Sequence, residues 1–143
     1  MKSDKKVRLK KEYAKKVSLQ INSLLDRGIQ PENIVIFGAS LGAYITMETA
    51  TILKNQKIKY VVLGLCSESA VELYSNTSND LCGNFLSIYE RSDEKKSCLP
   101  ILIETDCKEG VKEIMLDMGL GHGFLYKPYD DWMEPLVEWI EDK

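Results

Sequence analysis

Ser40 stands in a stretch whose composition is typical of an activated serine. The β-prone apolar residues 34–37 lead into Gly38-Ala39-Ser40-Leu41-Gly42, and a helix-compatible segment follows. A strand, a sharp turn and a helix in that order expose the hydroxyl at the bend. Glycine on both sides suits this turn, because the strand and helix backbones come too close for side chains and the central residue is often strained. The stretch therefore predicts Ser40 as a nucleophile.

Asp93 and His122 each follow a predicted strand, as Ser40 does. The carboxyl ends of parallel strands meet at one edge of a sheet, which is where ligands bind. A hydroxyl must lose its proton when it attacks a carbonyl, and imidazole is suited to accept that proton near neutral pH. A carboxylate fixes the imidazole tautomer and stabilises the imidazolium. We therefore expect Ser40, Asp93 and His122 to form a catalytic triad.

Each of these three residues also has a purely structural interpretation. Small residues suit any turn from strand to helix, a lone histidine in a loop can satisfy a buried carbonyl, and Ser-Asp is common in turns. Asp106 is a rival for the acid, because it would follow residues 99–105 if that run were a strand. The chain from Asp106 to His122 is too short for a crossover helix plus a strand, which favours Asp93.

Hydrophobic periodicity predicts alternating helices and strands, with helices at 5–27, 41–55, 67–74 and 131–141 and strands at 34–37, 59–66, 84–90 and 111–117. Polar or glycine-rich loops are expected at 75–80 and 118–123. Residues 98–107 are ambiguous, since Pro100 fits the first turn of a helix or the start of a strand, and we favour the helix. The order predicts an α/β fold in which a mostly parallel sheet of about four strands has helices on both faces. Residues 1–143 are expected to form one domain.

Composition excludes several classes of protein. A net charge of -3 and a pI near 5.3 give no electrostatic basis for nucleic-acid binding, and the basic cluster at residues 2–16 is interpreted as the solvated face of a helix. No apolar run approaches the ~18 residues that a membrane span needs. Charged residues follow Met1, so no signal peptide is expected and a cytoplasmic location is predicted.

The four cysteines, Cys66, Cys82, Cys98 and Cys107, have no CxxC spacing, and the chain contains one histidine. A metal site is therefore not expected, and neither is a cofactor. Buried free thiols are the expectation, with one disulfide left open. Cys66 and Cys98 are the first pair to test, because both follow strand ends.

Four segments carry a resemblance to a known family: residues 34–43 (IVIFGASLGA), 60–66 (YVVLGLC), 85–94 (FLSIYERSDE) and 119–126 (GLGHGFLY), followed by Trp132 and Trp139. This pattern resembles the α/β-hydrolase superfamily, most closely bacterial serine hydrolases of unassigned substrate, from about Tyr13 onward. The resemblance implies Ser40 as nucleophile, Asp93 as acid, His122 as base and the Leu41 amide as an oxyanion donor. It also implies hydrolysis of a small carboxylic ester or thioester without a cofactor.

The chain departs from this family because the first four strands of the full fold have no counterpart. The second oxyanion donor normally comes from that half, and losing one donor costs about 10² to 10³ in turnover. The strand at 34–37 is also left with an unpartnered edge. We expect a homodimer joined antiparallel through this edge into an eight-stranded sheet, with the N-terminal helix over the seam.

Two other functions compete with the hydrolase. A truncated, non-catalytic hydrolase-like protein with an interaction role would share the same sequence pattern. A flavodoxin-like or nucleotide-binding domain is disfavoured, because residues 38–42 have neither the GxGxxG nor the P-loop spacing.

Overall fold

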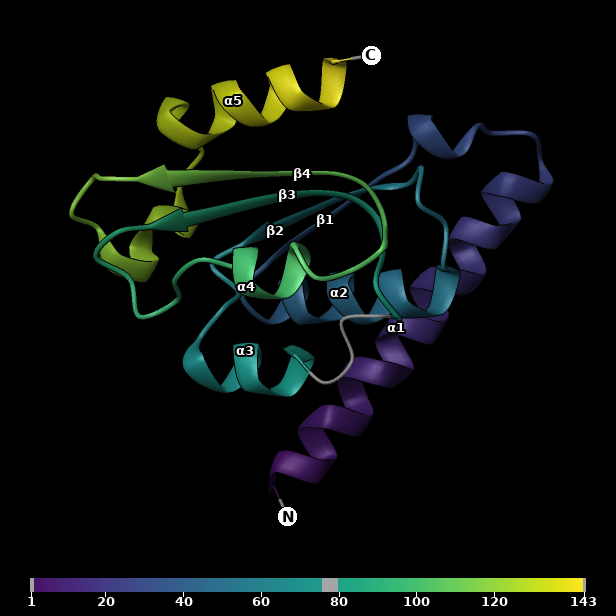
Figure 1. Ribbon diagram of the computed structural model, residues 1–143, viewed down its shortest axis with the longest axis horizontal. Helices are drawn as coiled ribbons and strands as arrows, with labels where there is room; N and C mark the ends of the chain where they lie inside the picture. The colour runs from purple at the N-terminus through teal and green to yellow at the C-terminus, as the bar shows by residue number, and fades with distance from the viewer. Residues whose placement is uncertain (1, 76–79, 143) are drawn as a thin grey trace.

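The computed structural model describes residues 2–75 and 80–142, which form three layers with a parallel sheet in the middle (Figure 1). The elements in chain order are α1 (Lys2–Asp26), η1 (Pro31–Asn33), β1 (Val35–Ala39), α2 (Leu41–Leu53), β2 (Lys59–Leu63), α3 (Glu68–Ser75), β3 (Cys82–Glu90), α4 (Leu99–Leu102), β4 (Cys107–Leu116), η3 (Gly121–Tyr126) and α5 (Asp130–Glu141). The alternation of strands and helices is as predicted. The loop expected at 75–80 lies mostly outside the described residues.

The sheet contains four strands in the order β1-β2-β3-β4, and all neighbouring pairs are parallel. All five residues of β2 are buried, which explains why this strand appears in the sequence as a continuous apolar run. Parallel pairing brings the carboxyl ends of the strands to a common edge. The fold therefore delivers the segments after β1, β3 and β4 to one end of the sheet.

Helices cover both faces of the sheet. On one face, α1 to α4 enclose a core that includes Met47, Tyr60, Phe85 and Ile101. On the other face, η3 and α5 pack against the sheet around the buried Phe124 and Trp132, as Figure 1 shows for α5. The expected arrangement of helices on both faces is confirmed.

Buried Lys59 fixes the end of α5 to the sheet. Its ammonium group donates to the carbonyls of Ile140, at 2.8 Å, and Asp142, at 3.2 Å. These carbonyls belong to the last turn of α5 and the residue after it, where a positive charge is favourable. The bond satisfies a cation that would otherwise be costly to bury.

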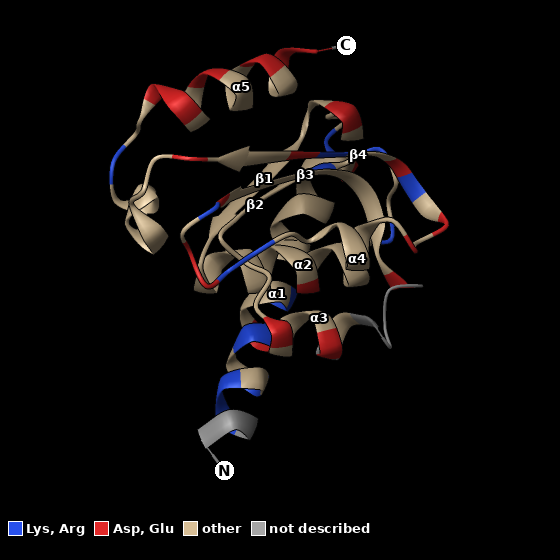
Figure 2. Ribbon diagram, turned by 60° about the vertical axis from the view of Figure 1, so that its left-hand side comes forward, with Lys and Arg blue, Asp and Glu red and all other residues tan. Residues whose placement is uncertain are grey.

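Charges are segregated along the chain. Figure 2 shows lysine and arginine residues along the N-terminal half of α1, and acidic residues on α5. Lys5, Lys6 and Lys11 are exposed, as expected for the solvated face of a helix. No helix in the described part of the chain combines the length and apolarity needed to cross a bilayer.

Two boundaries differ from the prediction. The fourth strand was expected at 111–117 but begins at Cys107, because the polar run Cys107-Lys108-Glu109-Gly110 pairs with β3 across a register shift between Gly83 and Asn84. The ambiguous segment forms a single helical turn, Leu99–Leu102, so the preference for a helix is confirmed over a much shorter span.

The expectation of free thiols was wrong. Cys66 pairs with Cys98, the pair singled out from the sequence, and Cys82 pairs with Cys107. Cys82 and Cys107 are register partners at the start of β3 and β4, with their Cα atoms 4.6 Å apart. The late start predicted for the fourth strand concealed this second pair. The cytoplasmic location stays a prediction.

The outer edge of β1 has no strand partner among the described residues. The amide of Ser40 donates to Leu63 and the carbonyl of Ile34 accepts from Lys59, so alternate residues face β2. The amides and carbonyls of Val35, Phe37 and Ala39 therefore point away from the sheet. In this single chain α1 packs against α2. The dimer, and the placement of α1 over its seam, stay predictions.

Candidate active site

Ser40 lies between β1 and α2 in a backbone conformation that few residues other than glycine adopt, with φ 54° and ψ -115°. Two hydrogen bonds hold it there: its amide donates to the Leu63 carbonyl and its carbonyl accepts from the Ala43 amide, both at 3.0 Å. Such strain typically costs about 1 to 3 kcal/mol and is concentrated at functional sites. The predicted sharp turn is present, and its hydroxyl makes no helix cap.

Of the two glycines beside Ser40, only Gly38 is required by space. A Cβ on Gly38 would lie 2.2 Å from the Gly42 carbonyl oxygen and 2.4 Å from the Thr46 hydroxyl. A Cβ on Gly42 would meet nothing within 4 Å. Strand and helix therefore come too close for a side chain at Gly38, as predicted. At Gly42 this prediction was wrong, because a side chain there would point into open space.

His122 lies in η3, just beyond β4, and contacts both other predicted triad members. Its Nε2 is 3.1 Å from the Ser40 Oγ, and its Nδ1 is 2.7 Å from the Asp93 Oδ2. With the Nδ1 proton donated to the carboxylate, Nε2 is free to accept the serine proton. The imidazole is about one-third exposed, while the Asp93 side chain is only 4% exposed. The structure thus brings Ser40, His122 and Asp93 into one hydrogen-bonded chain.

Asp93 is held from both sides of its carboxylate. Oδ2 accepts from His122, and Oδ1 accepts from the backbone amide of Lys95 at 3.1 Å. The rival acid Asp106 is exposed and directly precedes β4, at the opposite end of that strand from His122. The structure therefore places Asp93, and not Asp106, beside the imidazole.

Gly64, which the sequence analysis did not single out, packs against the His122 ring. It has a φ of 61°, and a Cβ there would lie 3.1 Å from His122 Cε1. The Trp132 indole of α5 donates to the carbonyls of Phe124, at 3.0 Å, and Lys127, at 3.1 Å. These contacts fix η3 to α5 and to the end of β2, and so fix the position of the imidazole.

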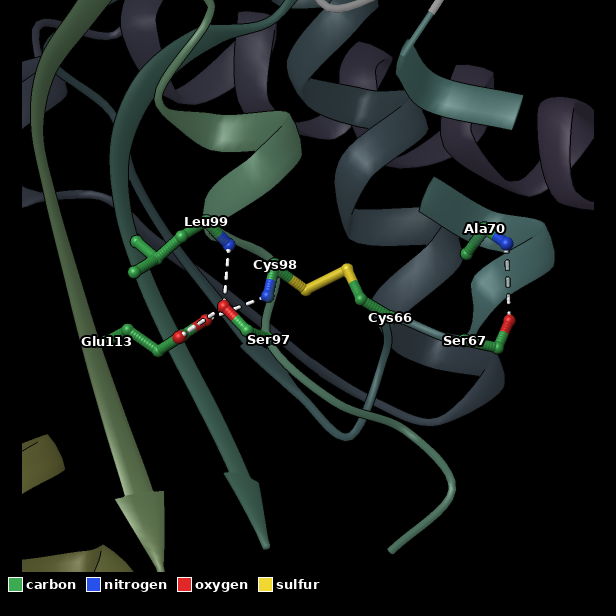
Figure 3. Close-up of a disulfide and its surroundings, with 7 residues drawn as sticks. All are labelled: Cys66, Ser67, Ala70, Ser97, Cys98, Leu99 and Glu113. Atoms are coloured by element: carbon green, nitrogen blue, oxygen red, sulfur yellow. Dashed lines mark hydrogen bonds between the residues drawn. A yellow bond between two sulfur atoms is a disulfide. The ribbon is translucent and has the colours of Figure 1, made fainter. Parts of the chain in front are cut away.

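The far end of the loop that carries Asp93 is anchored by a disulfide and by Glu113 (Figure 3). Cys98 is bonded to Cys66, and the Cys66 carbonyl accepts from the Lys96 amide at 2.7 Å. The Glu113 carboxylate accepts from the Ser97 hydroxyl at 2.6 Å and from the Cys98 amide at 2.8 Å. Sequence reasoning missed Glu113, because an acidic residue in a half-exposed strand has no distinguishing pattern.

The backbone amides of Leu41 and Gly42 begin α2 directly after Ser40. The first amides of a helix have no intrahelical partner, and the helix dipole favours negative charge there. Leu41, the donor predicted from the resemblance, is therefore suitably placed for an oxyanion forming at Ser40. In residues 2–75 and 80–142, no three His, Cys, Asp or Glu side chains gather as metal ligands do.

A cavity of about 390 Å³ opens beside Ser40, between α1 and α2. Its apolar wall consists of Leu9, Tyr13, Leu41, Tyr44 and Ile45, and its two cationic side chains are Lys6 and Lys10. The Lys10 ammonium lies 3.9 Å from the centre of the Tyr44 ring, a cation–π contact. The space next to the hydroxyl is therefore small and mainly apolar.

The crystal structure of Arabidopsis thaliana SOBER1 F65L is similar to this chain, with a TM-score of 0.69 at 20% sequence identity. The match covers 90% of this chain, which spans only 62% of the SOBER1 chain. SOBER1 has a hydrolase fold, so the sheet and its flanking helices correspond to part of the α/β-hydrolase fold, as predicted. No protein-family model matches the sequence, and no curated protein matches it.

Proposed function

We propose that the chain is a serine hydrolase of the esterase type, cleaving a small carboxylic ester or thioester. The observation that carries this proposal is the hydrogen-bonded chain from Ser40 through His122 to Asp93. Its three members come from the ends of three different strands, so the arrangement depends on the whole sheet and not on one local turn. A chance contact between a histidine and a serine gives no reason for a buried carboxylate to bond the other nitrogen of the imidazole.

The reaction begins when the Ser40 Oγ bonds to the carbonyl carbon and the His122 Nε2 takes the hydroxyl proton. The carbonyl π electrons move to oxygen, where the Leu41 amide stabilises the negative charge, while Asp93 stabilises the imidazolium. Collapse of this intermediate breaks the bond to the leaving oxygen or sulfur, which receives the proton from His122. A water molecule then repeats the sequence on the acyl-enzyme and restores the serine.

The cavity beside Ser40 favours a substrate whose acyl group is short and apolar. Its wall has three aliphatic and two aromatic side chains, and its volume of about 390 Å³ lies at the lower end of the range for small-molecule sites. Lys6 and Lys10 add positive charge to the same space. We therefore expect short-chain esters to be better substrates than long-chain esters.

Residues 1–143 by themselves are expected to turn over slowly. One oxyanion donor, Leu41, follows Ser40 directly, and the family resemblance places the second donor in a segment without a counterpart here. The absence of one donor corresponds to a loss of about 10² to 10³ in turnover. We therefore expect hydrolysis that is measurable with activated aryl esters and slow with ordinary alkyl esters.

Release of p-nitrophenol from p-nitrophenyl acetate tests the proposal. Wild-type protein should turn over, and both Ser40→Ala and His122→Ala should fall to the buffer rate. Asp93→Asn should lose most of the activity, because an amide in place of the carboxylate favours the wrong imidazole tautomer, whereas the matched variant Asp106→Asn should keep it. Equal losses in the two aspartate variants would contradict the assignment of the acid.

A second candidate, a non-catalytic hydrolase-like protein with an interaction role, is favoured by the open outer edge of β1 directly before Ser40. An edge of unpaired backbone groups is a template for another chain. This alternative predicts a folded wild-type protein that hydrolyses no p-nitrophenyl ester even at high protein concentration.

A further inference from the structure

Glu90 is the last residue of β3 and is fully buried. One carboxylate oxygen, Oε1, accepts from the backbone amides of Met118, at 2.5 Å, and Gly119, at 3.1 Å. The other oxygen, Oε2, accepts from the Ser92 amide at 2.6 Å and from the Ser92 hydroxyl. A single buried carboxylate therefore bonds both the loop after β3 and the loop after β4.

Ser92 extends this connection between the two loops. Its hydroxyl oxygen also accepts from the Gly121 amide, at 2.8 Å. Ser92 directly precedes Asp93, and Gly121 directly precedes His122. The hydrogen bonds of Glu90 and Ser92 thus connect the residue that directly precedes Asp93 with the residue that directly precedes His122.

The charge of Glu90 is retained despite its burial. Burial raises the pKa of a carboxyl, but the bonds from the Ser92 hydroxyl and from the Met118, Ser92 and Gly119 amides outweigh this effect. Together they lower the pKa of Glu90 to about 2. The carboxylate is therefore ionised at every pH at which a histidine acts as a base, and it accepts hydrogen bonds from all four donors.

We propose that Glu90, with Ser92, is a positioning residue that locks the loop of Asp93 to the loop of His122 and so sets the distance between the triad acid and base. The inference rests on the proposed function for its kinetic consequence, but the geometry it describes does not need turnover. Neither residue lines the cavity beside Ser40, so neither is expected to contact the substrate. Their effect is exerted through Asp93 and His122.

Two substitutions weaken this lock to different degrees. Glu90→Gln keeps the size of the side chain but replaces one accepting oxygen with an amino group that faces donors. Ser92→Ala removes the hydroxyl that joins Glu90 to Gly121 and leaves the backbone intact. Ser92 is exposed, so this variant is expected to fold even if Glu90→Gln does not.

Arg91 supplies a matched control. Its guanidinium lies 3.5 Å from the Asp117 carboxylate, and both side chains are 68% exposed. This ion pair connects the same two loops at the surface, where such pairs contribute little. Arg91→Met therefore removes a contact between the loops without touching the buried carboxylate.

The test combines kinetics with NMR of His122, which is the only histidine in the chain. In wild-type protein labelled with ¹⁵N-histidine, the proton between Nδ1 and Asp93 should give one strongly deshielded signal. We expect kcat for p-nitrophenyl acetate to fall about 100-fold in Glu90→Gln and about tenfold in Ser92→Ala, at unchanged KM, with this signal broadened or lost. Arg91→Met should match wild type in both readouts.

Wild-type kcat and an unchanged His122 signal in folded Ser92→Ala would overturn the inference, and so would equal losses in Arg91→Met. If Glu90→Gln does not fold, Ser92→Ala decides the question alone. If wild-type protein shows no hydrolysis at all, the proposed function fails, and the His122 signal in the variants still reports whether the two loops are locked together.

Discussion

Gly38 and Gly42 flank Ser40 symmetrically in the sequence but not in space. Gly38 faces the start of α2 at a distance that no side chain allows, whereas Gly42 faces open space. We expect Gly38→Ala to lower the free energy of unfolding by at least ~1 to 3 kcal/mol, the range for overpacking. Gly42→Ala should be neutral or stabilise by up to ~1 kcal/mol, because alanine favours a helix. Chemical denaturation of the two variants checks this, and equal stabilities would contradict the described turn.

The individual residues that could be predicted from the sequence are those whose side chains are themselves reactive. Ser40, Asp93 and His122 each have a reactive side chain within a few residues of the end of a predicted strand, and the structure joins them. Glu90, Ser92 and Glu113 were missed because their importance lies in what they accept or donate across loops. In the sequence, a glutamate or serine that is buried and hydrogen-bonded looks the same as one that is solvated.

At the scale of elements, the two disulfides lie at opposite ends of the sheet. Cys66–Cys98 joins the segment after β2 to the far end of the loop that carries Asp93, while Cys82–Cys107 joins the starts of β3 and β4. The paired cysteines are separated by 32 residues in the first disulfide and by 25 in the second. Chain-entropy arguments therefore give both a similar effect on stability, about 3 to 4 kcal/mol.

Their effects on activity should differ. Replacing Cys66 and Cys98 with serine should lower both the free energy of unfolding and the rate of ester hydrolysis, because the loop of Asp93 loses an anchor. Replacing Cys82 and Cys107 with serine should lower stability by a similar amount and leave the rate per folded molecule unchanged. Thermal unfolding and p-nitrophenyl acetate hydrolysis, measured on both double variants, check this, and equal rates would argue against the anchoring role.

Element types were predictable, but some element boundaries were not. The strands with continuous apolar runs, such as β2, were recognised because burial on both faces leaves a strong pattern. The edge strand β4 begins with Cys107-Lys108-Glu109-Gly110, where polar residues and a register shift conceal the pairing with β3. These four residues include Cys107. Because their place in β4 was missed, the pairing of Cys107 with Cys82 was missed as well.

At the scale of the whole molecule, the open edge of β1 remains the feature that most needs a partner. Backbone groups of Val35, Phe37 and Ala39 face outward there, and Phe37 is 48% exposed although it stacks on Trp132, with ring centroids 6.4 Å apart. A strand pairing across a two-fold axis would satisfy these groups and give a continuous sheet. We propose that a second copy of this chain is the partner.

Light scattering checks the dimer and its location. Wild-type protein at micromolar concentration should have twice the 16.3 kDa mass of one chain. Val35→Pro removes an outward amide without breaking a bond to β2, so it should yield folded monomers, whereas Val35→Ala, which keeps the amide, should remain dimeric. A wild-type monomer would refute the dimer, and a dimeric Val35→Pro would place the interface elsewhere.

The most direct test of the hydrolase is labelling with a fluorophosphonate probe, followed by mass spectrometry of the labelled peptide. The probe requires a nucleophilic serine and an intact base, but it does not require that the natural substrate be known. The structure predicts one adduct, on Ser40, that is absent in Ser40→Ala and forms much more slowly in His122→Ala. Folded wild-type protein that stays unlabelled, or labelling that persists in Ser40→Ala, would contradict the proposed mechanism.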